Sequence, residues 1–271
     1  MLPYIDIPPL KIYGPLQIYP FGALVATGII VGTIIAGKRA ERLGMNRNLI
    51  SEMATWAVVP GFIVAHLYSI LFYFPERVLE EPLVLLKFWD GISSFGGFVG
   101  GTAGVFAYFY RRKLPFWPHA DAVIYGFVFA WIFGRLGCSV AHDHPGLPTD
   151  FFLAINYPKT EHFDAGPRHD LGFYEFLWAV AVSAYFYTQR NKPKFTGWYL
   201  TMFGILYAPV RFLFDFLRTA DKRYAGLTPG QFAAIAFFFV AIWVYQKRKS
   251  IGELLGPDHP WRPPNPDFSK T

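Results

Sequence analysis

The chain has 271 residues, of which 53% are hydrophobic, 20% aromatic and only 16% charged, and its formal net charge is +6. Soluble globular domains carry about 25% charged residues, so the composition excludes an ordinary soluble protein and favours a membrane protein. The positive charge needs no nucleic-acid partner, because topology and contact with anionic lipid account for it. The single cysteine, Cys138, excludes an internal disulfide.

Apolar runs of about 20 residues, each long enough to cross a bilayer, recur along the chain. Seven are expected, at residues 18–37, 53–73, 92–110, 121–140, 171–188, 197–217 and 229–246. The stretch 81–89 is too short to span and is predicted to be interfacial or re-entrant. No cleavable signal peptide is evident, so the first span is expected to act as an uncleaved targeting signal. The predicted fold is all-α, with one transmembrane domain over 1–250 and a proline-rich tail over 251–271.

Basic residues are distributed unevenly between the two sides of this topology. Of the 25 lysines and arginines, 15 follow the first, third and fifth spans or lie in the C-terminal tail, and 8 lie on the other side. By the positive-inside rule the richer side, with the C-terminus, is cytoplasmic. The N-terminus, residues 141–170 and residues 218–228 are then expected to face outward.

Glycine is concentrated in the third predicted span, which reads GISSFGGFVGGTAG. Small residues four apart let membrane helices approach closely, so tight packing is one interpretation of Gly96 and Gly97. The other interpretation is that this pair breaks or loosens the helix and presents backbone N–H groups to an anion. The sequence leaves both open.

Two arginines lie inside predicted spans, Arg135 in AVIYGFVFAWIFGRLGCSV and Arg211 in WYLTMFGILYAPVRFLFDF. A guanidinium at bilayer depth is costly, so it is kept where a partner or a wet cavity receives it. Arg135 has no acidic residue close by in its segment, and Arg211 has Asp215 one turn away. The pattern predicts an external anion such as a lipid phosphate. The alternative is an arginine that snorkels to a nearby interface.

The longest segment outside the predicted spans is 141–170, which contains His142, Asp143 and His144. A loop of this length within a compact membrane bundle is usually functional or disordered. Its Phe, Ile and Tyr content argues against disorder. Cys138 lies just before it, and a lone intramembrane cysteine is most often a small packing residue.

Several motifs together resemble the prolipoprotein diacylglyceryl transferase family, over about residues 10–246. They are IYGPLQIYPFG, AHLYSILFY, SSFGGFVGG, FGRLGC, PRHDLGFYE, LYAPVRFLFDFLR and LTPGQ. The resemblance implies a multi-pass enzyme of the bacterial inner membrane, with 141–170 as a periplasmic loop. Such an enzyme moves the diacylglyceryl group of phosphatidylglycerol to the lipobox cysteine thiol of a prolipoprotein signal peptide and releases glycerol 1-phosphate. No cofactor is expected, and membrane lipid and prolipoproteins are the expected partners.

This reaction suggests roles for the residues identified above. Arg135 and Arg211 are predicted to bind the phosphate in bidentate fashion. Tyr207 precedes Arg211 by one turn and faces the same side of its helix. Tyr19 matches a family position near the headgroup, and the Gly96–Gly97 pair is a further candidate lipid contact.

Glu175, in the fifth predicted span, is expected to orient one of the arginines. The alternative is a structural pairing with Arg168 or His169.

The sequence also departs from the family pattern. Phe95 occupies a position that is usually histidine, Cys138 one that is usually asparagine, and His66 one that is usually arginine. An acid of the family motif is approximated only by Asp143.

The segment around His142 and His144 offers a replacement for the missing proton-handling group, because histidine titrates where a thiol proton must be removed. His66 is the next candidate for this role. His142, Asp143 and His144 also resemble a metal half-site, which would need a further ligand such as His162, His169 or Asp170. A solvated polar loop is the third interpretation, and no metal is assigned to the site.

Two classes of function remain open. The first is the transferase. The second is a non-catalytic or differently specific membrane protein that binds anionic phospholipid on the same scaffold, which Phe95 and Cys138 favour.

Overall fold

The computed structural model describes residues 1–13, 16–87, 91, 93–161, 163–219, 223–252 and 254–255. The chain divides into two compact units, one made of residues 1–44 and 120–271 and the other of residues 45–119. The predicted C-terminal tail lies almost entirely outside the described residues.

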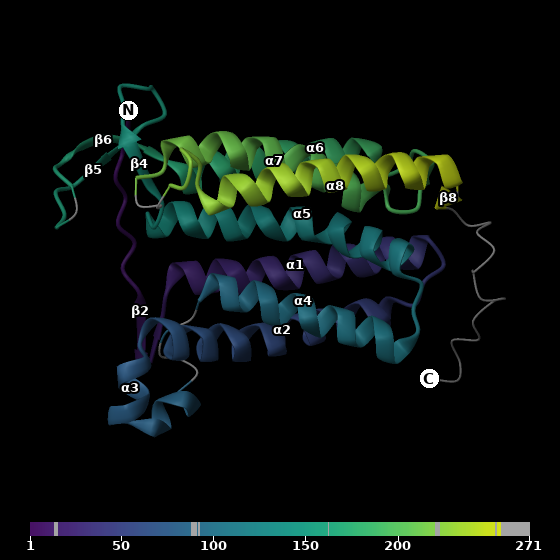
Figure 1. Ribbon diagram of the computed structural model, residues 1–271, viewed down its shortest axis with the longest axis horizontal. Coiled ribbons are helices and arrows are strands. Elements are labelled where there is room, and N and C mark those ends of the chain that lie inside the picture. The colour runs from purple at the N-terminus through teal and green to yellow at the C-terminus, as the bar shows by residue number, and fades with distance from the viewer. Residues whose placement is uncertain are drawn as a thin grey trace. The chain divides into compact units, whose positions relative to one another are not determined.

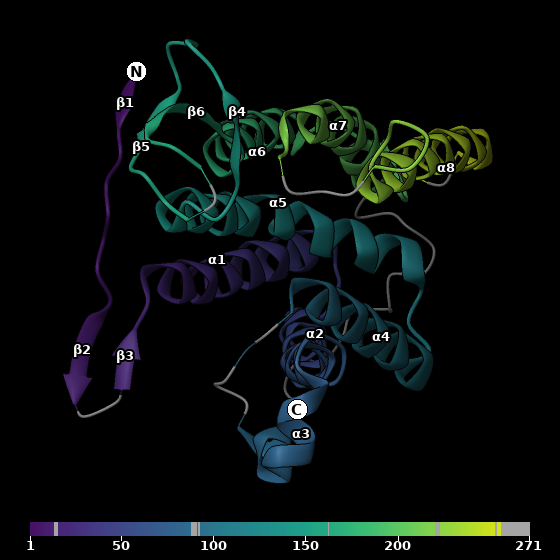
Figure 2. The same ribbon diagram turned by 60° about the vertical axis from the view of Figure 1, so that its left-hand side comes forward.

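Five long helices build the first unit (Figures 1 and 2). They are α1 (Pro20–Arg42), α5 (Phe116–Ala141), α6 (Leu171–Gln189), α7 (Trp198–Phe214) and α8 (Pro229–Ile251). In both views α5 lies between α1 and the other three helices. Small residues allow the contact with α1, since a Cβ at Gly32 would come within 2.8 Å of the Ala130 side chain.

An aromatic-rich core fills the space between α5, α6 and α7. Its buried members are Tyr125, Val128, Trp131, Ala179, Val182, Phe186, Trp198 and Tyr199. Ser183 crosses this core with a hydrogen bond to the carbonyl of Val128, 2.8 Å long. Such a link between membrane helices fixes their rotation as well as their separation.

Short strands accompany the helices, so the prediction of a purely helical fold needs correction. A four-stranded sheet has the order β1 (Leu2–Pro3), β5 (Ile155–Tyr157), β6 (Gly166–Asp170) and β4 (Pro145–Pro148). Strand β1 runs parallel to β5, and the other pairs are antiparallel. The described part of the segment 141–170 is thereby joined to the N-terminus of the chain through β1 and β5. Two further pairs are β2 (Leu10–Tyr13) with β3 (Leu16–Ile18), and β7 (Lys194–Phe195) with β8 (Leu254–Leu255).

The second unit is built on the packing of α2 (Arg47–Tyr68) against α4 (Ser94–Arg112). Glycines on α4 make this contact possible: a Cβ at Gly96 would lie 2.7 Å from the carbonyl oxygen of Val64, and one at Gly100 2.4 Å from that of Pro60. Helix α4 runs unbroken through its glycines. The interpretation as tight packing therefore applies, and the expectation of a broken helix is wrong.

A short irregular region joins these two helices. A π-helical turn (Ser69–Tyr73) extends α2 and is followed by α3 (Pro75–Glu80) and a 3-10 helix (Pro82–Leu86). His66 is fully buried, with Nδ1 3.1 Å from the carbonyl oxygen of Gly91 and Nε2 3.0 Å from that of Val84. Both ring nitrogens face backbone carbonyls, so His66 ties this region to α2 and is poorly placed to act as a base.

Seven long helices coincide with the seven predicted spans among the described residues. By length and apolarity, five segments qualify as candidate membrane spans: Pro20–Arg42, Arg47–Tyr73, Phe116–Ala141, Trp198–Leu217 and Pro229–Ile251. Helices α4 and α6, of 19 residues each, are not among them. The protein is thus mostly helical and polytopic.

Candidate active site

Two arginines from different helices converge on one carboxylate. Glu175 lies near the start of α6, and only 2% of its surface is exposed. Its Oε2 is 2.7 Å from Nε of Arg135 on α5, and its Oε1 is 3.4 Å from Nη1 of Arg211 on α7. The exposed fractions of the two arginine side chains are 20% and 19%. The guanidinium groups therefore share a buried counter-charge, while part of each arginine side chain stays accessible.

A close approach of α5 and α6 brings this carboxylate to Arg135. Gly172 packs directly on the backbone of Cys138 and Ser139, where a Cβ would come within 2.8 Å of main-chain atoms. Gly172 precedes Glu175 by nearly one turn, so the helices touch where Glu175 and Arg135 meet. A larger residue at 172 would separate the ion pair.

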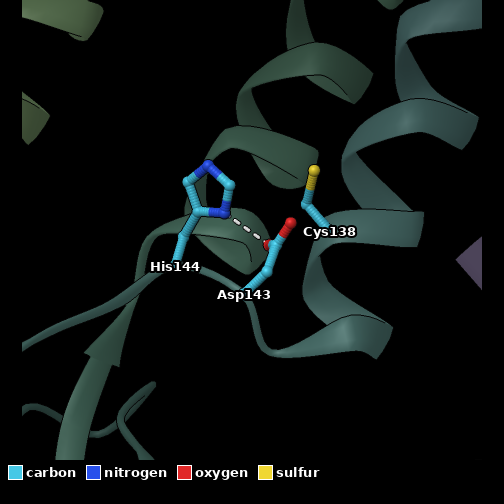
Figure 3. Close-up of side chains that lie close together, drawn as sticks. All are labelled: Cys138, Asp143 and His144. Atoms are coloured by element: carbon cyan, nitrogen blue, oxygen red, sulfur yellow. Dashed lines mark hydrogen bonds and ion pairs between the residues drawn. The ribbon is translucent and has the colours of Figure 1, made fainter. Parts of the chain in front are cut away.

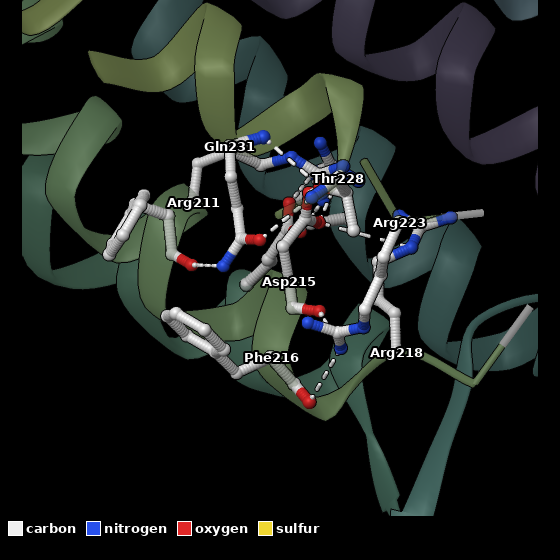
Figure 4. A network of polar contacts seen from close by, with 10 residues as sticks. Arg211, Asp215, Phe216, Arg218, Arg223, Thr228 and Gln231 are labelled. Carbon is white, nitrogen blue, oxygen red and sulfur yellow. Dashed lines mark hydrogen bonds and ion pairs between the residues drawn. The ribbon is translucent and has the colours of Figure 1, made fainter. Parts of the chain in front are cut away.

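A second carboxylate extends the network at the end of α7. Asp215 is fully buried, and its Oδ1 lies 2.9 Å from Nη2 of Arg211 (Figure 4). Its Oδ2 accepts a hydrogen bond from Thr228, the N-cap residue of α8. Thr228 and Gln231 form a reciprocal capping box, and Gln231 also donates to the carbonyl of Phe212. The start of α8 thus holds Asp215, and through it Arg211, in place.

The start of α8 carried no role predicted from the sequence. A Cβ at Gly230 would lie 2.5 Å from Oδ2 of Asp215 and 3.3 Å from Nη2 of Arg211, so a glycine is needed there. The motif LTPGQ contained the signal, because threonine and glutamine three residues apart predict a capping box. Which carboxylate the box would hold was not visible in the sequence.

The two tyrosines predicted for the site differ in their placement. Tyr207 lies one turn before Arg211 and within electrostatic range of Glu175 and both arginines. Its ring packs edge-on against Trp131 of α5, with ring centroids 5.6 Å apart. Tyr19 immediately precedes α1 and is 61% exposed. Among the contacts of the described residues, none joins Tyr19 to the arginine pair.

Gly96 and Gly97 belong to the second unit, and their backbone N–H groups are already bonded. Gly96 donates to Oγ of Ser93 over 3.4 Å, and Gly97 donates to the carbonyl of Ser93 over 2.9 Å. Neither N–H group is therefore presented to an anion. A role of these glycines in binding lipid stays a prediction.

His142 is held inside a network that links the N-terminal segment to the helices. Its Nδ1 is 3.0 Å from Oδ2 of Asp170, and its Nε2 is 3.3 Å from the carbonyl oxygen of Ile5. Tyr157 donates to the same Asp170 oxygen, and burial together with the Asp170 charge raises the pKa of Tyr157. The ring of Tyr4 stacks on the imidazole, with centroids 4.0 Å apart. Because both its nitrogens are engaged, His142 connects structural elements and offers no free lone pair to a substrate thiol.

Asp143 and His144 instead lie beside the end of α5 (Figure 3). The ligand-type atoms of Cys138, Asp143 and His144 all lie within 4.8 Å of one another. Nδ1 of His144 contacts a carboxylate oxygen of Asp143. The Sγ atom of Cys138 is 4.0 Å from Nη1 of Arg135. The sequence grouped Asp143 with His142, whereas the structure groups it with Cys138 and His144.

A cavity adjoins this cluster. Its volume is about 660 Å³, and it is lined by Asp143, His144, Pro145, Phe163, Arg168, Leu171, Arg218 and Thr219. The lining places polar and cationic side chains at one edge of the cluster. A charged or polar ligand therefore has access to Asp143 and His144.

Among the contacts of the described residues, Glu175 pairs with neither Arg168 nor His169, so the alternative pairing is not seen. Arg168 donates to the carbonyl of Gly146 over 3.2 Å and lies over the ring of Phe163. Nδ1 of His169 lies 2.9 Å from the hydroxyl of Tyr174, and burial lowers the pKa of His169. Glu175 thus forms ion pairs with Arg135 and Arg211, and its role in orienting them stays a prediction.

The chain matches the family model described as prolipoprotein diacylglyceryl transferase over residues 9–246. The chain belongs to this family. It is 28% identical to the phosphatidylglycerol–prolipoprotein diacylglyceryl transferase of Chromohalobacter salexigens, over 93% of this chain and 97% of the relative. It is 29% identical to the protein of the same name from Nitratidesulfovibrio vulgaris, over 93% of this chain and 98% of the relative. It is also 29% identical to the protein of that name from Pseudomonas putida, over 92% of this chain and 98% of the relative. The predictions of this family and of a transferase are confirmed.

Proposed function

We propose that the protein transfers the diacylglyceryl group of phosphatidylglycerol to the lipobox cysteine thiol of a prolipoprotein and releases glycerol 1-phosphate. The observation that carries the proposal is the convergence of Arg135 and Arg211 on Glu175, with about a fifth of each arginine side chain exposed. The relatives that cover nearly the whole chain are named for this lipid and this protein substrate.

The arginine pair fits the electrostatic demand of the reaction. The phosphate is the leaving group, so negative charge develops on its bridging oxygen as the glycerol carbon is attacked. Arg135 and Arg211 present fixed, permanently charged N–H groups to that phosphate. Glu175 and Asp215 hold the two guanidinium planes, so little reorganisation is needed when the charge appears. Tyr207 adds a hydroxyl within electrostatic range of the same groups.

The location of the site in the helix bundle supports a multi-pass enzyme of the bacterial inner membrane. Arg135, Glu175 and Arg211 lie toward the ends of α5, α6 and α7 that adjoin the four-stranded sheet. The opposite ends of the helices carry the basic residues Arg39, Arg42, Arg190, Lys192, Lys194, Arg248 and Lys249. The positive-inside rule makes those ends cytoplasmic, so the site opens toward the outer side, where a translocated signal peptide presents its thiol.

The proposal is tested with purified protein, phosphatidylglycerol and a synthetic lipobox peptide in detergent. Mass spectrometry is expected to detect a diacylglyceryl peptide together with an equal amount of glycerol 1-phosphate. A peptide with serine in place of the lipobox cysteine is expected to remain unmodified.

Arg135→Gln tests the site, and Arg42→Gln is its matched control, because Arg42 is an exposed arginine at the far end of α1. Arg135→Gln is expected to lower the rate at least about 100-fold, as for loss of one preorganised donor to a developing charge, while Arg42→Gln retains it. A wild-type protein that binds phosphatidylglycerol but forms neither product with several lipobox peptides would instead support a non-catalytic lipid-binding protein.

A further inference from the structure

Three side chains with different metal-ligating atoms meet at the end of α5. Cys138 lies three residues before the last residue of the helix, and Asp143 and His144 follow the turn at His142, whose φ is 50°. This turn folds the chain back, so that the thiol, a carboxylate oxygen and an imidazole nitrogen lie within 4.8 Å of one another (Figure 3). Ligands around one tetrahedral ion are closer, about 3.3–3.8 Å apart, because each lies about 2.0–2.3 Å from the metal, so a rotamer adjustment of about 1 Å would complete the site.

The donor set is one that suits a zinc-class ion. Thiolate sulfur, imidazole nitrogen and carboxylate oxygen are the three ligand types of Zn²⁺ in proteins. Three protein ligands leave a fourth position open, which is the arrangement of reactive zinc sites. The thiolate of Cys138 and the carboxylate of Asp143 together balance the charge of a divalent ion. The site would therefore be neutral beside Arg135.

The surroundings allow an ion and a substrate to reach the cluster. Asp143 is exposed, His144 and Cys138 are partly buried, and the 660 Å³ cavity includes Asp143 and His144 in its lining. The Sγ atom of Cys138 is 4.0 Å from Nη1 of Arg135. An ion held by Cys138 would thus lie next to an arginine of the proposed phosphate site, where an attacking thiolate is required.

We propose that Cys138, Asp143 and His144 bind one divalent zinc-class metal ion, whose open position binds the acceptor cysteine as a thiolate. The nature of that acceptor rests on the proposed function, whereas the metal site itself does not. A thiol bound to such an ion is deprotonated at neutral pH, so no separate base is needed. This accounts for His142, whose two nitrogens are engaged elsewhere.

The reaction balances without an oxidant or a reductant. The acceptor thiol loses its proton to solvent as its sulfur binds the metal. The thiolate sulfur then attacks the glycerol carbon of the lipid that carries the phosphate. A carbon–sulfur bond forms and the carbon–oxygen bond to phosphate breaks, so the phosphate leaves with the electron pair as glycerol 1-phosphate. The thioether product is a weaker ligand than a thiolate and dissociates from the metal.

Cobalt(II) is the probe for the metal site, because its bonds to thiolate give an intense near-ultraviolet charge-transfer band. Untagged, metal-free full-length protein in detergent is titrated with Co²⁺. The wild type is expected to show this band at one Co²⁺ per chain. Cys138→Ser is expected to lose the band and to weaken Co²⁺ binding more than about 100-fold, beyond the usual effect of losing a supporting group of a metal site.

Two further variants keep the test decisive if Cys138→Ser folds poorly. Asp143→Asn and His144→Gln alter side chains at the edge of the cavity, and each is expected to weaken Co²⁺ binding by more than about tenfold. Asp150→Asn is the matched control, since Asp150 is an exposed carboxylate of the same segment outside the cluster, and its affinity should stay within about twofold of the wild type. Absence of the band in the wild type, or equal binding by all variants, would overturn the metal site.

The open position is tested by adding the lipobox peptide to the cobalt protein. Binding of a second thiolate is expected to increase the band about twofold, and the serine peptide should leave it unchanged. Transfer that continues at the wild-type rate after chelation, in a protein without a cobalt band, would overturn this inference and leave the transferase standing. A band that increases with the cysteine peptide in the absence of any transfer would support the metal site and overturn the proposed function.

Discussion

The first unit buries arginines at both ends of its helices, and the two ends use them differently. At the end bearing the basic loops, Arg39 is only 9% exposed and lies between the rings of Tyr125 and Tyr199, 4.5 and 4.3 Å from their centroids. It also donates to the carbonyl of Arg190. Arg248, 7% exposed, donates to the carbonyl of Thr196 over 3.0 Å. Arg39 is thus enclosed by aromatic rings and Arg248 is bonded to Thr196.

At the other end, Arg135 and Arg211 are held by carboxylates instead. Each keeps about a fifth of its side chain exposed. The ion pair of Arg135 with Glu175 uses the Nε edge of the guanidinium. An arginine surrounded by rings and carbonyls stabilises the fold and has no capacity for a ligand. An arginine fixed from one side by a carboxylate is oriented but still able to bind an anion. The type of partner, together with the larger exposed fraction, thus distinguishes a candidate catalytic arginine from a structural one.

The largest effect is expected when the geometry of the open arginines is changed at constant charge. Arg135→Lys or Arg211→Lys replaces a planar fork by a point charge, and transfer should fall about 100-fold or more. The melting temperature should change little, because a cation remains. Rates are measured by mass spectrometry of the peptide product. Lysine variants with wild-type rates would remove both arginines from the proposed phosphate site.

The next largest effect is expected on stability, when the shared carboxylate of Glu175 is removed. Glu175→Gln leaves Arg135 and Arg211 without their common counter-charge, and the free energy of unfolding should fall by about 2–3 kcal/mol. This is less than for a fully buried pair, because both arginines are partly exposed. Added phosphatidylglycerol should restore part of the stability, since its phosphate supplies the missing charge. Glu41→Gln, at an exposed position of α1, is the control. Equal melting of the two variants would contradict the prediction.

An intermediate effect on activity is expected at Gly230. Gly230→Ala places a Cβ against Asp215 and Arg211, and the resulting shift should reduce transfer about tenfold or more. Gly22→Ala is the matched control, because a Cβ at Gly22 meets no atom within 4 Å. Similar rates in the two variants would show that the start of α8 does not position Arg211.

At the end of the first unit that bears the basic loops, we expect the opposite pattern, in which stability falls and activity is kept. Arg39→Lys loses the stacking of a planar cation between two tyrosine rings, which should lower the free energy of unfolding by about 1–2 kcal/mol. Transfer per folded molecule should remain that of the wild type. Denaturant unfolding and the product assay, measured on the same preparation, check both parts. Reduced transfer by a stable Arg39→Lys protein would break the distinction between the two ends.

The smallest expected effect is a pH dependence from His169. Burial lowers its pKa in the folded protein, so the unfolded chain binds a proton at higher pH than the folded chain does. Stability should therefore decline as the pH falls below about 6.5, the ordinary value for histidine, and level off below the folded pKa. His169→Gln should flatten this part of the profile, measured as melting temperature against pH. An unchanged slope would assign the pH dependence to other groups.

The sequence predicted the helices well because the signal is local. Every predicted span overlaps a long helix, since apolar length is a property of consecutive residues. The sheet was missed because β1 pairs with β5, a partner more than 150 residues away, and both strands are too short to show an alternating pattern. The glycines of α4 were left ambiguous, because only the position of α2 shows what they contact.

For the candidate site, the sequence by itself identified Arg135 and Arg211, since a permanent charge inside an apolar run is costly and is retained for a use. Only the tertiary structure brought both to Glu175, placed Gly230 beside Asp215, occupied both nitrogens of His142, and joined Cys138 to Asp143 and His144. The cost of burying a charge depends on the residue and its immediate segment, so this cost can be estimated from the sequence. Which atoms satisfy that charge depends on helix rotation and turn geometry, which many distant contacts determine together.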